Sequence, residues 1–101
     1  MKPLIQQLKA ASGAIRLRIM DDLKRPRDNF PSQVDGDLVT DGVCADFIRE
    51  RLGIAAATAS RHLTLLTDAG FLLPTRKKGW TFYRRDEAAI AEFVGRLGSE
   101  L

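Results

Sequence analysis

The sequence has 101 residues, of which 45% are hydrophobic and 29% charged, and its formal net charge is +3 at pH 7. A chain of this length forms at most one compact domain, which is too small for a two-domain enzyme or a deep cofactor cavity. Its apolar runs are far shorter than the ~20 residues that cross a bilayer. We therefore expect a single cytoplasmic domain, residues 1–101, without contact to a membrane.

The basic residues are concentrated in one part of the chain. Residues 55–85 hold six basic and one acidic residue, a net charge of +5, and residues 80–83 add three aromatic side chains. Residues 1–54 hold nine basic and eight acidic residues, and residues 86–101 hold one and four. A localised basic surface with aromatic side chains is typical of proteins that bind nucleic acid. On charge alone, a basic face that is merely solvated is the open alternative.

The first quarter of the sequence has the spacing of amphipathic helices. Apolar residues recur at every third or fourth position, namely Leu4, Leu8, Ala11, Ile15, Ile19 and Leu23. A Ser-Gly pair interrupts this stripe, so we predict helices at residues 3–11 and 14–25. Pro26 ends the second one, because proline cannot supply the next backbone donor. Residues 26–42 are rich in Pro, Gly and Asp, and we predict a loop there.

A helix-turn-helix is predicted at residues 43–69. Its first helix starts at Asp41 and stops at Gly53. Its second helix starts within about two residues and runs to Gly70, which suits the left-handed backbone that ends many helices. Two helices joined by a tight, glycine-containing turn form this motif.

A wing and a last helix complete the predicted fold. Residues 71–75 and 80–84 have the composition of short strands, and Arg76, Lys77 and Lys78 form a basic tip between them. We place this wing at residues 71–85 and an amphipathic helix at residues 86–101. The predicted fold class is mainly α with a small β-hairpin, a winged helix-turn-helix.

The second helix of the motif is the predicted reader of double-stranded DNA, because an α-helix fits the major groove. Its face opposite the apolar stripe carries Ala57, Ser60, Arg61 and Thr64, and Ala56 and Thr58 lie in its first turn. Arg61 can donate two hydrogen bonds to one guanine, and the alanines permit close approach to the bases. Arg76, Lys77 and Lys78 are expected to contact phosphates and to set affinity more than sequence choice. An ordinary solvated helix face is the alternative.

The terminal helices are the predicted dimerisation elements. Residues 1–25 and 86–101 carry an apolar set made of Leu4, Leu8, Ile90, Phe93 and Leu97. So much apolar surface on the terminal helices of a short monomer is expected to be buried across a two-fold axis. A homodimer would place two recognition helices about one turn of DNA, ~34 Å, apart and would select an inverted repeat.

The sequence lacks the usual catalytic and cofactor motifs, such as G-x-G-x-x-G, a Walker loop or H-E-x-x-H. We therefore expect no enzyme, no cofactor and no metal. The lone His62 is expected to be packed against the core, and the lone Cys44 to behave as a small buried hydrophobe. Trp80 and Phe82 are expected to close the core beneath the wing. The acidic residues of the loop, Asp35, Asp37 and Asp41, are expected to form turns.

Residues 43–86 resemble the ArsR family of bacterial winged-helix repressors. The run Leu52-Gly53-Ile54 is followed by Thr58-Ala59-Ser60-Arg61-His62-Leu63, then by Asp68-Ala69-Gly70-Phe71, Gly79-Trp80 and Tyr83. Residues 14–20 are similar to the family's early helix, though more loosely. The resemblance implies a homodimer, joined through its first and last helices, that binds a dyad-symmetric operator as a transcriptional repressor.

Two departures from the family pattern concern metal sensing. The metal-sensing members carry two cysteines in C-V-C-D, whereas this chain reads Val43-Cys44-Ala45-Asp46. Other members use Asp and His on the last helix, which here has no His. A third departure is Ala55, which stands where many members have a serine cap. The open alternatives are a metal- or redox-responsive sensor acting through Cys44 and a winged-helix module that contacts only proteins. The effector, the operator and the sign of regulation are left open.

Overall fold

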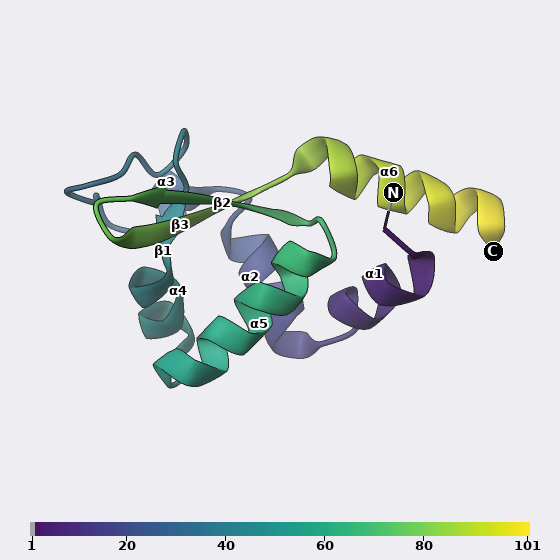
Figure 1. The fold of residues 1–101 in the computed structure, drawn as a ribbon, viewed down its shortest axis with the longest axis horizontal. Coiled ribbons are helices and arrows are strands. Elements are labelled where there is room, and N and C mark those ends of the chain that lie inside the picture. Colours follow the sequence, from purple (N-terminus) through teal and green to yellow (C-terminus); the bar gives the residue numbers. More distant parts are fainter. Residues whose placement is uncertain (1) are drawn as a thin grey trace.

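The computed structural model describes residues 2–101 as six helices and three strands (Figure 1). In chain order these are α1 (Leu4–Ala11), α2 (Ala14–Asp22), α3 (Pro26–Asn29), β1 (Val43–Cys44), α4 (Ala45–Leu52), α5 (Ala56–Asp68), β2 (Leu72–Lys77), β3 (Trp80–Arg85) and α6 (Glu87–Glu100). The strands form one antiparallel sheet in the order β1-β3-β2. The predicted fold class, a winged helix-turn-helix, is confirmed. None of the helices within residues 2–101 has the length and apolar character needed to cross a membrane.

Helix α5 lies at the centre of the fold. It contacts α1, α2, α4 and β2, and it buries Ala59, Leu63 and Leu66. These side chains join Ile19 of α2 and Ile48 of α4 in one hydrophobic core. Because every residue of this set is at most 2% exposed, a Leu-to-Ala change there would remove packing worth about 2–5 kcal/mol.

Glycines end both helices of the helix-turn-helix, as predicted. Gly53 has φ +69°, its N–H donates to the Glu50 carbonyl, and the N–H of Ile54 donates to the Arg49 carbonyl at 3.2 Å. Gly70 has φ +86°, and the N–H groups of Gly70 and Phe71 make the equivalent bonds at the end of α5. This paired pattern satisfies carbonyls that a helix end leaves unpaired.

The wing is a hairpin with a two-residue turn. Lys77 pairs with Trp80, so that only Lys78 and Gly79 lie between the strands, and both have positive φ, 51° and 81°. Two left-handed residues make the type I′ turn whose twist matches that of a hairpin. The strands are longer than predicted, and Arg76 and Lys77 belong to β2 rather than to the tip.

Three local predictions were wrong. Helix α2 ends at Asp22, not at residue 25, and the Asn29 side chain donates to the Asp22 carbonyl at 2.8 Å. Pro26 begins the short helix α3 within the predicted loop, because proline suits the first helical position. Residues 43–44 form strand β1 instead of the first turn of a helix, and they pair with Tyr83 and Phe82 of β3.

Gly42 allows β1 to pair with β3. Its φ is +108°, and a Cβ atom at this position would overlap the backbone carbonyl of Tyr83. The glycine is buried, so the neighbouring strand cannot move away without disturbing the sheet. A side chain at position 42 would therefore clash with backbone as well as strain its own.

Gly42→Ala is expected to destabilise the fold more than Gly53→Ala. Gly53 also has a left-handed backbone but has nothing within 4 Å of its Cβ position, so alanine there should cost only the backbone strain, about 1–2 kcal/mol. Urea unfolding followed by circular dichroism would measure both losses. Equal losses of unfolding free energy in the two variants would contradict this prediction, because they would show that the clash at position 42 adds nothing to the backbone strain.

Candidate nucleic-acid interface

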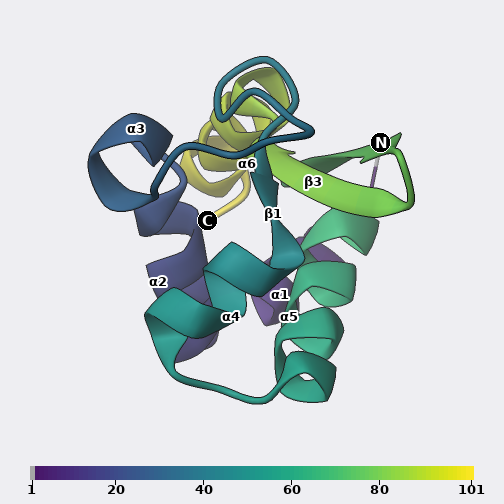
Figure 2. The same cartoon turned by 90° about the vertical axis from the view of Figure 1, so that its left-hand side faces the viewer.

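The outer face of α5 presents the residues that the sequence predicted for DNA reading. Ala56, Ala57, Ser60, Arg61 and Thr64 are exposed, and Thr58 is half-buried. Ala57, Arg61 and Thr64 lie opposite the buried stripe of the same helix, and Ala56 and Thr58 belong to its first turn. Figure 2 shows α5 and the β2–β3 hairpin along the same side of the molecule. The reading helix and the basic wing can therefore contact one partner together.

Helix α5 begins without a side-chain cap. Ala55 has φ −69° and ψ 151°, which is the backbone of a capping residue, but its methyl group accepts no hydrogen bond. The first backbone N–H groups of α5 thus lack a side-chain acceptor, and the positive end of the helix dipole lies beside the exposed Ala56 and Ala57. An uncapped positive helix end favours an anionic partner.

Arg16 of α2 holds α5 against α1. Its Nε donates to the Ala10 carbonyl at 2.7 Å and one terminal nitrogen to the Lys9 carbonyl at 3.2 Å. The other terminal nitrogen lies 3.1 Å from Nδ1 of His62. Because a guanidinium can only donate, Nδ1 must be the acceptor, and the ring proton is on Nε2. His62 is half-buried as expected, but its partner is a side chain of another helix.

The surroundings of His62 keep it neutral. Partial burial is the largest cause that lowers its pKa from 6.5, and the nearby Arg16 and Arg61 lower it further. Neutral histidine can continue to accept the Arg16 hydrogen bond at physiological pH. His62 therefore positions α5 from within and adds no charge to its outer face.

The wing lysines are paired with the acidic loop. Nζ of Lys77 lies 3.0 Å from Oδ2 of Asp41, and Nζ of Lys78 lies 3.9 Å from Oδ1 of Asp35. Arg76 donates to the Thr81 hydroxyl at 3.3 Å across the hairpin. All three cations are exposed, as the sequence predicted, but two of them are partly neutralised by carboxylates of the same chain.

The acidic loop is built to hold Asp41 in place. The backbone N–H of Asp37 donates to Oδ2 of Asp41 at 2.8 Å, and the Asp37 carboxylate accepts the N–H groups of Val39 and Thr40. The Asp37 N–H and Lys77 lower the pKa of Asp41, and the N–H groups of Thr40 and Val39 lower the pKa of Asp37. Asp41 lies in a turn and Asp35 in a bend, in line with the expectation, and both also bind a wing lysine. Spacing in the sequence gives no signal of a contact 36 residues apart.

The predicted dimer residues pack largely within their own chain. Leu4, Leu8, Ile90 and Leu97 are half-buried against the core. Phe93 is 8% exposed and meets the Phe71 ring edge-on, with centroids 5.0 Å apart, so most of its surface is already covered by its own chain. The large apolar side chains that remain exposed on the terminal helices and beside them are Ile5, Leu17, Val94 and Leu101.

A polar network joins α6 and α1 to the end of α5. Gln6 and Gln7 donate to the carbonyls of Asp68 and Ala69, and the Gln7 side chain is buried. Arg96 of α6 donates to Oε1 of Gln7 at 3.2 Å and to the Lys2 carbonyl at 2.7 Å. The two terminal helices are thus attached to the recognition helix as well as to each other.

Two other predicted positions differ in their exposure. Cys44 is buried in β1, and residues 2–101 contain no group of three or more His, Cys, Asp or Glu side chains that could hold a metal ion.

Phe82 is buried beneath the wing as expected, whereas Trp80 is 46% exposed, so its predicted place in the core was wrong.

Comparison with known proteins agrees with this geometry. No protein-family model matches the chain. An HTH-type transcriptional regulator of Bacillus subtilis (strain 168), the uncharacterized YbzH, is 38% identical over 97 residues, which cover 96% of this chain and 97% of the relative.

Solved structures share the fold at lower identity. A possible transcriptional regulator for arsenical resistance superposes with a TM-score of 0.69 at 20% identity, covering 93% of this chain and 82% of its own. An ArsR-like regulator from Rhodococcus sp. RHA1 gives a TM-score of 0.67 at 20% identity, covering 96% and 80%. These relatives are regulators of transcription rather than enzymes. The chain therefore belongs to the HTH-type transcriptional regulators, and it shares its winged-helix fold with ArsR-like regulators.

Proposed function

We propose that this protein is a sequence-specific repressor that reads DNA with the outer face of α5. The observation that carries this proposal is the exposed row of small and polar side chains around Arg61, on the same side as the basic wing (Figure 2). Residues 43–69 act as the helix-turn-helix and residues 71–85 as the wing. A protein that is bound to a promoter excludes RNA polymerase from the same DNA. Binding by itself is therefore sufficient for repression.

The proposed contacts with DNA are of two kinds, those that recognise bases and those that bind the phosphate backbone. Arg61 reads a guanine in the major groove, and Ser60 and Thr58 bond bases or phosphates. Ala56 and Ala57 permit close approach to the bases, and Thr64 lies on the same face as Arg61. Arg76, Lys77 and Lys78 contact the backbone beside the groove and contribute affinity at every sequence.

The protein acts as a homodimer through its terminal helices. Val94 is 60% exposed on α6 and Leu17 57% exposed on α2, and both line a shallow apolar depression that also includes Ile90 and Met20. A second chain would remove this apolar surface from water. Two-fold symmetry would then pair two recognition helices with the halves of an inverted repeat.

Arg61→Ala is expected to weaken binding to the operator by about 1–3 kcal/mol and to relax preference at one base step. Arg61 is exposed, so its loss should leave the fold intact. Lys77→Ala is the matched control, because losing a phosphate contact weakens all sequences alike. Selection of bound DNA from a random pool, followed by titration of the selected sites, makes the comparison. An unchanged base preference in Arg61→Ala would contradict the proposed reading face, and weak binding of the parent at every sequence would favour the protein-contact alternative.

Asp41→Asn is expected to tighten DNA binding at every sequence. Asparagine keeps an oxygen for the Asp37 N–H but removes the charge that neutralises Lys77, so one more cation becomes available to phosphate. The logarithmic dependence of affinity on salt should steepen by about one unit. Asp28→Asn makes the same change in net charge on α3, where the exposed carboxylate pairs with neither wing lysine, and should have a smaller effect. Identical effects of the two substitutions would mean that only net charge matters.

Val94→Glu is expected to convert a dimer into a monomer at micromolar concentration, because it places a charge in the proposed interface. Multi-angle light scattering measures the mass directly. Val34→Glu is the control, since Val34 is 99% exposed but lies in the loop before β1. A parent chain that is monomeric in the same measurement would contradict the proposed assembly.

A further inference from the structure

We propose that the cavity between the loop at residues 32–35, helix α4 and strand β3 of the wing binds an organic cation with an aromatic or other apolar body. This binding site goes beyond the reading of DNA, and it is separate from the outer face of α5. Its three walls come from separate segments of the chain, and the sequence analysis predicted no contact between them.

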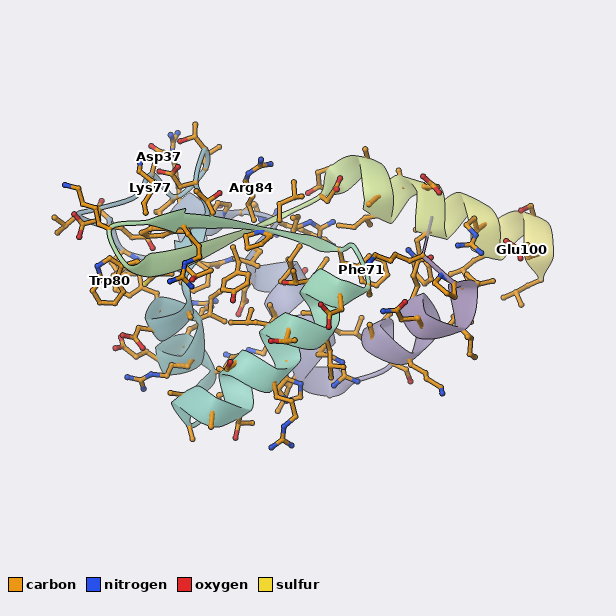
Figure 3. The ribbon with its side chains drawn as sticks, in the orientation of Figure 1. Asp37, Phe71, Lys77, Trp80, Arg84 and Glu100 are labelled. Atoms are coloured by element: carbon orange, nitrogen blue, oxygen red, sulfur yellow. The ribbon has the colours of Figure 1, made fainter. Side chains whose placement is uncertain are left out.

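Aromatic side chains form much of the cavity surface. Phe47 of α4 and Trp80 and Phe82 of β3 line a space of about 410 Å³, which is large enough for a small organic molecule. Trp80 is 46% exposed, and Figure 3 shows it on the side of the hairpin that faces α4. A large aromatic ring that is half-exposed at a cavity is a good contact surface for a cation, and tryptophan is the best of the aromatic residues in this role.

The charge of the cavity selects the sign of its ligand. Asp35, Asp46 and Glu50 are among the residues that line it, and no Lys, Arg or His is. Two cations approach these carboxylates from outside the lining. Arg49 lies 3.1 Å from Asp46 and 3.9 Å from Glu50, and Lys78 lies 3.9 Å from Asp35.

Three carboxylates are thus opposed by two cations, and only the Asp46 pair is close. The Glu50 side chain is 61% exposed, and Glu50 shares its nearest cation, Arg49, with Asp46. An anion would be repelled by these carboxylates, and a neutral apolar molecule would gain nothing from them. The carboxylates and the aromatic rings of the cavity can attract the same ligand only if it carries both a positive charge and an apolar surface.

The loop wall of the cavity is fixed before any ligand binds. Oε1 of Gln33 accepts the N–H of Cys44 at 2.7 Å, and its Nε2 donates to the carbonyl of Gly42 at 2.9 Å. Gly36 lies directly on the Phe82 ring, where a Cβ atom would come within 2.6 Å of a ring carbon. A ligand would therefore meet a preformed site and would not have to order a flexible segment.

The test uses Trp80, the only tryptophan of the chain, as an optical probe. The full-length protein, without DNA, is titrated with benzyltrimethylammonium, with neutral benzyl alcohol and with anionic phenylacetate. We expect a saturable change in tryptophan fluorescence with the cation, and at least tenfold weaker binding of the other two compounds. Equal binding of cation and alcohol would overturn the proposal, as would a cation response that does not saturate.

Matched variants locate the binding in the cavity. Glu50→Gln should weaken the cation at least threefold and leave benzyl alcohol unchanged. Glu100→Gln makes the same substitution at the far end of α6 (Figure 3) and should have no effect. Equal losses in the two variants would assign the response to overall charge and contradict a defined site. Because Trp80 is half-exposed, Trp80→Ala should fold, and ligand-detected NMR should show it to bind the cation more weakly; undiminished binding would overturn the role of the ring.

Discussion

The structure depends on the burial of one face of α5. Leu63 and Leu66 are completely buried, and Ala59 is nearly so, among side chains of α2 and α4. A helix of 13 residues that buries one stripe this fully has no rotational freedom left, so the opposite stripe must face solvent. The position of Arg61 on the surface is thus a consequence of hydrophobic packing and requires no contact of its own. Core formation and presentation of the reading face are one event.

Packing fixes the rotation of α5, and polar contacts from α1 and α2 fix its lateral position. The carbonyls at its C-terminal end receive hydrogen bonds from Gln6 and Gln7, while Arg16 reaches His62 near its middle. The Gln7 bond is buried and the Arg16 bond is partly buried, so the loss of either is more costly than the loss of a surface pair. The first two helices therefore act as a support for the recognition helix, whatever their role between subunits.

The sequence predicted well those features that depend on residues close to one another along the chain. Helical periodicity identified α1, α5 and α6, and the left-handed ends at Gly53 and Gly70 followed from the properties of glycine. Strand β1 has only two residues and exists because β3, some 40 residues later, offers it a partner, so no periodic signal could indicate it. The pairing of Lys77 with Asp41 was missed for the same reason. For the reading face, amphipathic spacing was sufficient to decide which side of α5 is exposed, whereas the acidic loop beside the wing required the folded chain.

The turn of the wing restricts how this protein can vary over generations. Lys78 and Gly79 both hold the backbone in the left-handed region, at φ 51° and 81°, where most side chains cost about 1–2 kcal/mol and β-branched ones are poorly tolerated. Positions 76 and 77 lie in extended strand, a backbone conformation that suits most side chains. Inherited changes in how tightly the wing holds its partner should therefore accumulate along β2, while the tip stays confined to the few residue types that its backbone permits. Lys78 therefore places a positive charge at the tip in spite of the conformational cost of its backbone.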